Sequence, residues 1–86
     1  MLTGVQIRAA RAALKWSAAR LAEEVGVAHK TIARFEEVDG IPRSRTSTLA
    51  EVRYKLEAAG IEFIEDDGRR GPGVRLALSN RPMQTG

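Results

Sequence analysis

Cysteine is absent from this 86-residue chain, and histidine occurs once, at His29. Disulfide bonds and thiolate metal sites are therefore excluded, and one imidazole is too few for a zinc centre or a hydrolytic triad. No apolar run approaches the ~20 residues of a membrane span, and no signal-peptide pattern precedes the first predicted helix. These absences predict a cytoplasmic protein that is not an enzyme, needs no metal or cofactor, and has no membrane partner.

The residues that are present describe one small globular domain with a basic bias. Hydrophobic residues make up 43% and charged residues 29% of the chain, and the net charge is +3. Residues 1–55 hold ten basic and six acidic side chains, whereas residues 56–86 hold four and five. The positive excess and the pI near 10.0 fit a polyanionic partner. The alternative is an arginine-rich surface that only reflects codon bias. A core this small also gains stability when a partner subunit extends it.

Residues 17–35 carry the most informative pattern. Leu21, Ala22 and Val25 fall on one helical face before Gly26, and Val27, Ile32 and Phe35 define a second apolar face after it. Two short amphipathic segments joined at a glycine predict a helix-turn-helix, because such a turn commonly needs a left-handed residue. The exposed face of the second segment carries donors to base edges and phosphates: His29, Lys30, Thr31 and Arg34. The segment therefore predicts sequence-specific DNA binding.

The flanking sequence predicts two more helices and a hairpin. The first helix spans about residues 3–15, capped by Thr3, and Ser17 caps the second. The third spans about 28–37, residues 38–42 form a loop, and a fourth helix begins between Ser44 and Thr48, where residues 48–51 fit a capping box, and stops at Gly60. Residues 61–65 and 74–78 alternate as strands around a loop at 66–73, and residues 79–86 read as a loose tail. The expected organisation is a DNA-binding domain at 1–60, a hairpin extension at 61–78 and a flexible tail at 79–86.

The same residues resemble the Cro/repressor-type (Xre-like) helix-turn-helix family over about residues 2–59. The matching positions are Leu14, Trp16, Leu21-Ala22, Gly26-Val27, Ile32, Phe35-Glu36 and Pro42. The resemblance implies a mainly α fold, a lambda-repressor-like helix-turn-helix bundle of about four helices, here followed by a C-terminal β-hairpin. It implies a transcriptional regulator, a repressor or autoregulator, that reads an inverted-repeat operator as a homodimer. Two positions depart from the family pattern: Ala18 stands where many members have glutamine, and Ala28 where many have a capping hydroxyl.

The resemblance also implies which residues meet DNA. Base contacts would come from Ala28, His29, Lys30 and Arg34. Phosphate contacts would come from Arg11, Ser17, Ala18, Arg20, Thr31, Arg43 and Arg45. In some members an arginine and a glutamate at the positions of Arg11 and Glu36 tie the first helix to the third. Glu37 and Asp39 would oppose phosphates, so we expect them to lie beside the contact surface. Trp16 and Phe35 are expected in the core.

Dimerisation is assigned to the C-terminal third. A second stripe on the fourth helix and the hairpin supply the expected interface: Ala50, Tyr54, Ala58, Ile64, Val74, Leu76 and Leu78. An isolated two-stranded hairpin leaves both edges unpaired and is marginally stable, so either another subunit or its own fourth helix must cover it.

Rival functions share the same fold. A protein-interaction module, antitoxin-like or anti-activator, would use the hairpin or tail to clasp a protein partner. A nonspecific nucleoid-type binder would ignore sequence. The glycine-rich stretch at 68–73 lacks the Lys-Ser/Thr ending of a P-loop, and the acids at 65–67 miss the spacing of a calcium loop. We interpret this loop as a solvated hairpin tip, with nonspecific contact to the DNA backbone as its alternative.

Overall fold

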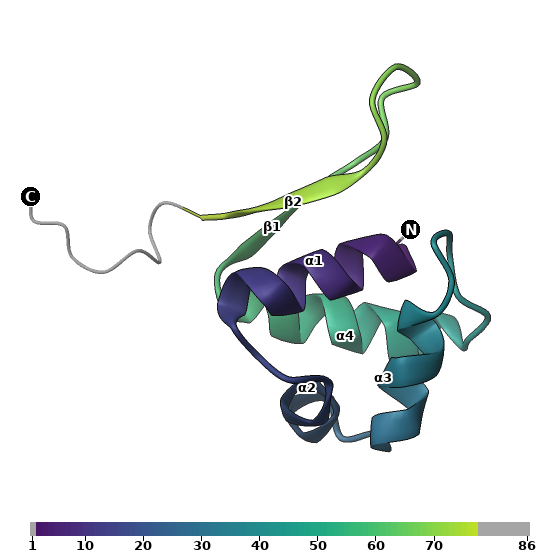
Figure 1. Cartoon of the computed structure of the whole chain (residues 1–86), viewed down its shortest axis with the longest axis vertical. Helices are drawn as coiled ribbons and strands as arrows, with labels where there is room; N and C mark the ends of the chain where they lie inside the picture. Colours follow the sequence, from purple (N-terminus) through teal and green to yellow (C-terminus); the bar gives the residue numbers. More distant parts are fainter. Residues whose placement is uncertain (1, 78–86) are drawn as a thin grey trace, which may run out of the picture.

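Four helices precede a two-stranded antiparallel sheet in the computed structural model, which describes residues 2–77 (Figure 1). In chain order the elements are α1 (Gly4–Leu14), α2 (Ala18–Val25), α3 (His29–Glu36), α4 (Thr46–Ala58), β1 (Ile61–Ile64) and β2 (Gly73–Leu76). The prediction of a mainly α chain with a C-terminal hairpin is confirmed. The expected tail at 79–86 and the expected interface residue Leu78 lie outside the described residues.

The first two helices begin at their predicted capping residues, and the third begins after Ala28, close to its predicted start. Thr3 and Gln6 form a full capping box at α1, and the Ser17 hydroxyl accepts a hydrogen bond from the Arg20 backbone N–H at 2.9 Å. Ala28 opens α3 without a side-chain cap, as its methyl group dictates.

The start of α4 falls within the predicted interval from Ser44 to Thr48, but the capping box predicted at 48–51 does not form. The helix begins at Thr46, after Arg45, and neither the hydroxyl of Thr48 nor the carboxylate of Glu51 caps it. Thr48 already lies in the first turn, where its backbone N–H donates to the carbonyl of Arg45 at 3.1 Å. A capping box needs its first residue in extended backbone, so Thr48 cannot form one inside the helix.

The core lies where the four helices meet. Its apolar side chains come from the segment before α1, from every helix and from β1: Leu2, Ile7, Ala10, Leu21, Ala22, Ile32, Phe35, Leu49, Val52, Leu56 and Ile61. Phe35 is fully buried, which confirms its predicted core position. Trp16 is only half-buried and packs at the edge of this cluster.

The hairpin folds back on its own chain. Ile61 pairs with Leu76 and Phe63 with Val74, and β1 contacts α4 while β2 contacts α1. The side-chain amide of Gln6, 1% exposed, donates to the carbonyls of both Ile64 and Gly73 at 3.1 and 3.2 Å. The hairpin is therefore anchored to α1 by a buried polar contact as well as by apolar packing.

The hairpin loop is closed by aspartates. One carboxylate oxygen of Asp67 accepts from the backbone N–H groups of Arg69 and Arg70 at 2.9 and 2.7 Å, and Asp66 accepts from Gly68 at 2.7 Å. Figure 1 shows this loop at the far end of the molecule from α2. The loop residues 66–71 are exposed, as expected for a solvated tip.

Candidate nucleic-acid interface

The turn between α2 and α3 is built around Gly26. Its φ of +88° lies in the left-handed region, and the N–H groups of Gly26 and Val27 both donate to the carbonyl of Ala22, at 2.8 and 3.0 Å. The chain reverses here, so that Leu21 on α2 and Ile32 on α3 are buried in the common core. This turn sets the orientation of α3 and therefore decides which of its side chains face solvent.

The outer face of α3 carries the expected base-contacting residues. Ala28, His29, Lys30 and Arg34 are exposed, whereas Ile32 and Phe35 occupy the opposite, buried face. A shallow depression runs along the outer face, lined by Lys30, Thr31, Ala33, Arg34 and Glu37. The structure therefore brings the donors of Lys30, Thr31 and Arg34 to one continuous surface.

Glu37, which we expected beside the contact surface, lines the same depression as Lys30 and Arg34. The helical repeat explains the difference, because a residue three after Arg34 and seven after Lys30 falls on the same stripe. Asp39 does lie elsewhere: its carboxylate accepts from Arg8 at 3.0 Å. The outer face of α3 is thus basic along most of its length and acidic at its C-terminal end.

Arg34 joins α3 to the loop that follows it. Its Nη1 donates to the backbone oxygen of Arg43 at 3.0 Å, and its guanidinium carbon lies 5.2 Å from the centroid of the Phe35 ring. Both partners restrain an otherwise flexible exposed side chain. Arg43 and Arg45 are both exposed, so the contact with the Arg43 backbone brings Arg34, a predicted base contact, to the loop that carries two predicted phosphate contacts.

The N-terminus of α2 gathers a second set of predicted phosphate contacts. Ser17 and Arg20 are exposed and Ala18 is half-buried. The Arg20 guanidinium lies 4.5 Å from the centroid of the Trp16 ring and pairs with Glu24 at 3.0 Å. These contacts occupy the Arg20 side chain, whereas the backbone N–H groups at the start of α2 remain a positive dipole end suited to an anion.

Arg11 and Glu36 form the ion pair that the resemblance implies. The Arg11 Nε and Nη2 donate to the two carboxylate oxygens at 2.7 and 2.8 Å, and Nη1 donates to the backbone oxygen of Trp16 at 2.8 Å. The hydrogen bond to Glu36 raises the pKa of Arg11, against a smaller opposing effect of burial. Because Glu36 neutralises this charge, we expect Arg11 to attract a DNA phosphate less strongly than an unpaired arginine would.

Sequence reasoning missed Arg8, which reinforces the same junction. Its Nη1 donates to the backbone oxygen of Glu36 and its Nη2 to Asp39. The contact satisfies a carbonyl at the C-terminal end of α3, where a cation is favourable. An arginine three residues before Arg11 was the available signal, because both side chains then lie on one face of α1.

The residues expected at the dimer interface fall on separate surfaces. Ala50, Tyr54 and Ala58 lie exposed along α4. On the hairpin, Val74 and Leu76 lie on the same face as Phe63, whereas the alternation of the strand puts Ile64 on the opposite face. The structure therefore does not bring Ile64 together with Val74 and Leu76.

Within residues 2–77 no group of three or more acidic or histidine side chains is placed to hold a metal ion, and none of the four helices is long and apolar enough to cross a membrane. No protein-family model and no curated protein matches the chain.

Proposed function

We propose that this protein is a sequence-specific DNA-binding transcriptional regulator with a lambda-repressor-like helix-turn-helix fold, acting as a homodimer on an inverted repeat. One observation carries the proposal: the Gly26 turn presents α3 with Lys30, Thr31 and Arg34 on one solvent-facing surface. A helix of this kind fits the major groove with its N-terminal residues leading.

Base reading is assigned to the start and middle of α3. Lys30 and Arg34 donate to guanine O6 and N7, and the fork of Arg34 makes the more discriminating, two-bonded contact. His29 donates or accepts at the exposed start of the helix. The methyl group of Ala28 suits a thymine methyl. Restraint of Arg34 by Arg43 and Phe35 supports this role, because a held side chain loses less entropy on binding.

Phosphate contact is assigned to both sides of α3. The first turn of α2, beginning after Ser17, offers backbone N–H groups, and Arg43 and Arg45 offer full charges. Thr31 contributes from α3. Arg20 and Arg11 are secondary, since Glu24 and Glu36 already neutralise them.

The test compares affinities for two duplexes at one salt concentration. The specific duplex is selected by the wild-type protein from a random pool, and the control duplex is its scrambled sequence. Arg34→Ala should weaken binding to the selected duplex by ~1–3 kcal/mol and relax preference at one base pair. Arg43→Ala should weaken binding to both duplexes and reduce the salt slope by about one.

Arg69→Ala supplies the matched control, because it removes the same charge from the exposed hairpin loop, far from α2. It should leave the preference for the selected duplex unchanged. The proposal fails if a His29/Lys30/Arg34 triple-alanine variant binds the selected duplex as tightly as the wild type. Equal wild-type affinity for both duplexes would instead identify a nonspecific binder.

A further inference from the structure

The exposed side of α4 is an apolar surface that the other described residues, within 2–77, leave uncovered. Leu49, Val52 and Leu56 face the core, and Ala50, Tyr54 and Ala58 follow one another at intervals of four on the solvent side. Tyr54 is 62% exposed, the highest value among the large apolar side chains of residues 2–77. The hairpin meets α4 where Arg53 lies 5.2 Å from the centroid of the Phe63 ring, and it leaves Tyr54 exposed.

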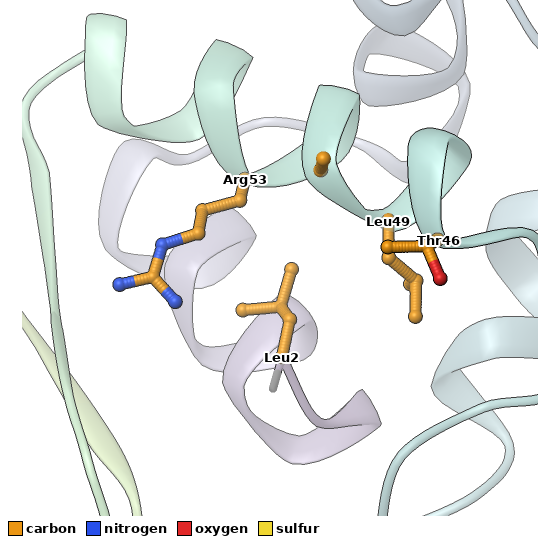
Figure 2. A pocket seen from close by; sticks show the side chains of 5 residues that line it. Leu2, Thr46, Leu49 and Arg53 are labelled. Carbon is orange, nitrogen blue, oxygen red and sulfur yellow. The ribbon is translucent and has the colours of Figure 1, made fainter.

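An apolar hollow extends this surface at the N-terminal end of α4 (Figure 2). It is lined by Leu2, Thr46, Leu49, Ala50 and Arg53, and Figure 2 shows Leu2, in the segment before α1, pointing toward the α4 side chains. Ala50 belongs to both the hollow and the exposed stripe, so the two form one patch. A continuous apolar patch of this kind on a small domain is typical of an association surface.

Two opposite charges flank the patch and have no ion-pair partner among residues 2–77. They are Glu51 and Lys55, one helical turn apart on the same side of α4. The neighbouring Arg53 differs, since it pairs with Glu57 at 3.0 Å and with Glu65 at 3.4 Å. A surface that carries one unpaired acid and one unpaired base beside an apolar stripe is complementary to itself.

We propose that a second copy of this chain covers the patch, with the two α4 helices packed antiparallel about a two-fold axis near residue 53. In a two-fold contact residue i meets residue j and residue j meets residue i. An axis at this position sets Glu51 opposite Lys55 of the partner subunit, and Lys55 opposite the partner's Glu51. The two Tyr54 rings then lie side by side in the middle, and the small side chains of Ala50 and Ala58 allow the helices to approach.

This inference rests on the homodimer in the proposed function and names its surface. It selects α4 over the hairpin strands, whose expected interface residues lie on opposite faces. A 13-residue helix is about 20 Å long, so the buried area is small and the free dimer is weak. Two adjacent half-sites on DNA would then favour dimerisation, because they raise the effective concentration of one subunit near the other.

The experiment measures the monomer–dimer equilibrium by sedimentation equilibrium without DNA, over a wide range of protein concentration. Glu51→Lys and Lys55→Glu should each weaken dimerisation about tenfold or more, because each sets like charges opposite one another. The Glu51→Lys/Lys55→Glu double variant should restore it. Both side chains lie off the buried face of α4, and circular dichroism checks that each variant is folded.

Glu23→Lys is the matched control, since it makes the same charge change at an exposed position of α2 and should leave the equilibrium unchanged. The α4 interface is wrong if wild-type protein stays monomeric throughout, if the single reversals have no effect, or if the double variant fails to recover. A half-site duplex in the same buffer separates the two proposals. If the protein is monomeric but binds this duplex, the DNA-binding proposal stands and the α4 interface fails. If the protein dimerises but binds no DNA, the α4 interface stands and the DNA-binding proposal fails.

Discussion

The guanidinium of Arg11 and the carboxylate of Glu36 are joined by two parallel hydrogen bonds of 2.7 and 2.8 Å. The side chain of Glu36 is 9% exposed and that of Arg11 is 23% exposed, so solvent screens the pair only partly. Arg11 also holds the carbonyl of Trp16, just before α2 begins. One side chain on α1 therefore connects the end of α3 with the start of α2, the two ends that frame the proposed DNA surface.

We expect Glu36→Gln to lower the free energy of unfolding by about 1–3 kcal/mol, because it removes the charge from a largely buried contact made of two hydrogen bonds. Urea denaturation measures the change. Glu24→Gln is the comparison, since its pair with Arg20 is exposed on one helix and should contribute less than about 0.5 kcal/mol. Equal effects of the two substitutions would show that the Arg11–Glu36 pair is no stronger than a surface pair.

Gln6→Glu should be among the most destabilising isosteric changes in the chain. The Gln6 amide donates to the carbonyls of Ile64 and Gly73, and its oxygen accepts from the backbone N–H and the hydroxyl of Thr3. A carboxylate would keep the Thr3 contacts but face two carbonyl oxygens without a donor. The expected cost is about 2–4 kcal/mol at neutral pH.

The pH dependence of the stability of the Gln6→Glu variant tests the same contact. Burial without donors should raise the pKa of the new carboxyl group above its ordinary value. Its protonated form can donate to one carbonyl, so the destabilisation relative to wild type should shrink as the pH falls through that raised pKa. A deficit that stays constant from about pH 7 to 4 would contradict the assignment.

Gly4→Ala should destabilise the protein by about 1–3 kcal/mol through overpacking. A β-carbon at Gly4 would collide with the backbone oxygens of Val38 and Phe35, which cannot move as a side-chain tip can. The Gly4 N–H also donates to the carbonyl of Gly40 at 2.8 Å, so the helix cannot simply shift away. Thermal denaturation tests this, with Gly71→Ala as the control: its β-carbon meets open space and should change stability by under about 0.5 kcal/mol.

The hairpin loop should loosen in acid. Hydrogen bonds from the backbone N–H groups of Arg70 and Arg69 lower the pKa of Asp67 below its ordinary value. A folded-state pKa below the unfolded one means that the carboxylate stabilises the loop above the unfolded pKa. That stabilisation is lost as the pH falls through the folded pKa.

Amide chemical shifts of Arg69 and Arg70, followed from about pH 6 to 2, should therefore titrate together with a midpoint below the ordinary pKa of an aspartate. Asp67→Ala should abolish this titration and leave the amides of α3 unaffected. A midpoint at or above the ordinary value for aspartate would show that these hydrogen bonds do not hold the carboxylate.

The sequence by itself determined the parts of this protein that depend on neighbours within one or two helical turns. Thr3 and Ser17 cap helices and Gly26 makes the turn because their own side chains, or the lack of one, set the local backbone. The apolar spacing of Ile32 and Phe35 determined which face of α3 is buried, and with it the exposure of Lys30 and Arg34. Each of these signals is complete within a short segment, so it can be interpreted without knowing the fold.

Only the tertiary structure decided where segments meet. Gln6 donates to the backbone carbonyls of Ile64 and Gly73, which are 58 and 67 residues away in the chain. Because both partners accept through the backbone, their side chains give no sign of this contact in the sequence. The close approach of Gly4 to the end of α3 likewise depends on two helix ends that no local pattern connects. The packing of the hairpin on α1 as well as α4, and the separation of Ile64 from Leu76, follow from the pleat and register of a sheet. These depend on contacts between segments far apart in the chain, and such contacts form only when the whole core assembles.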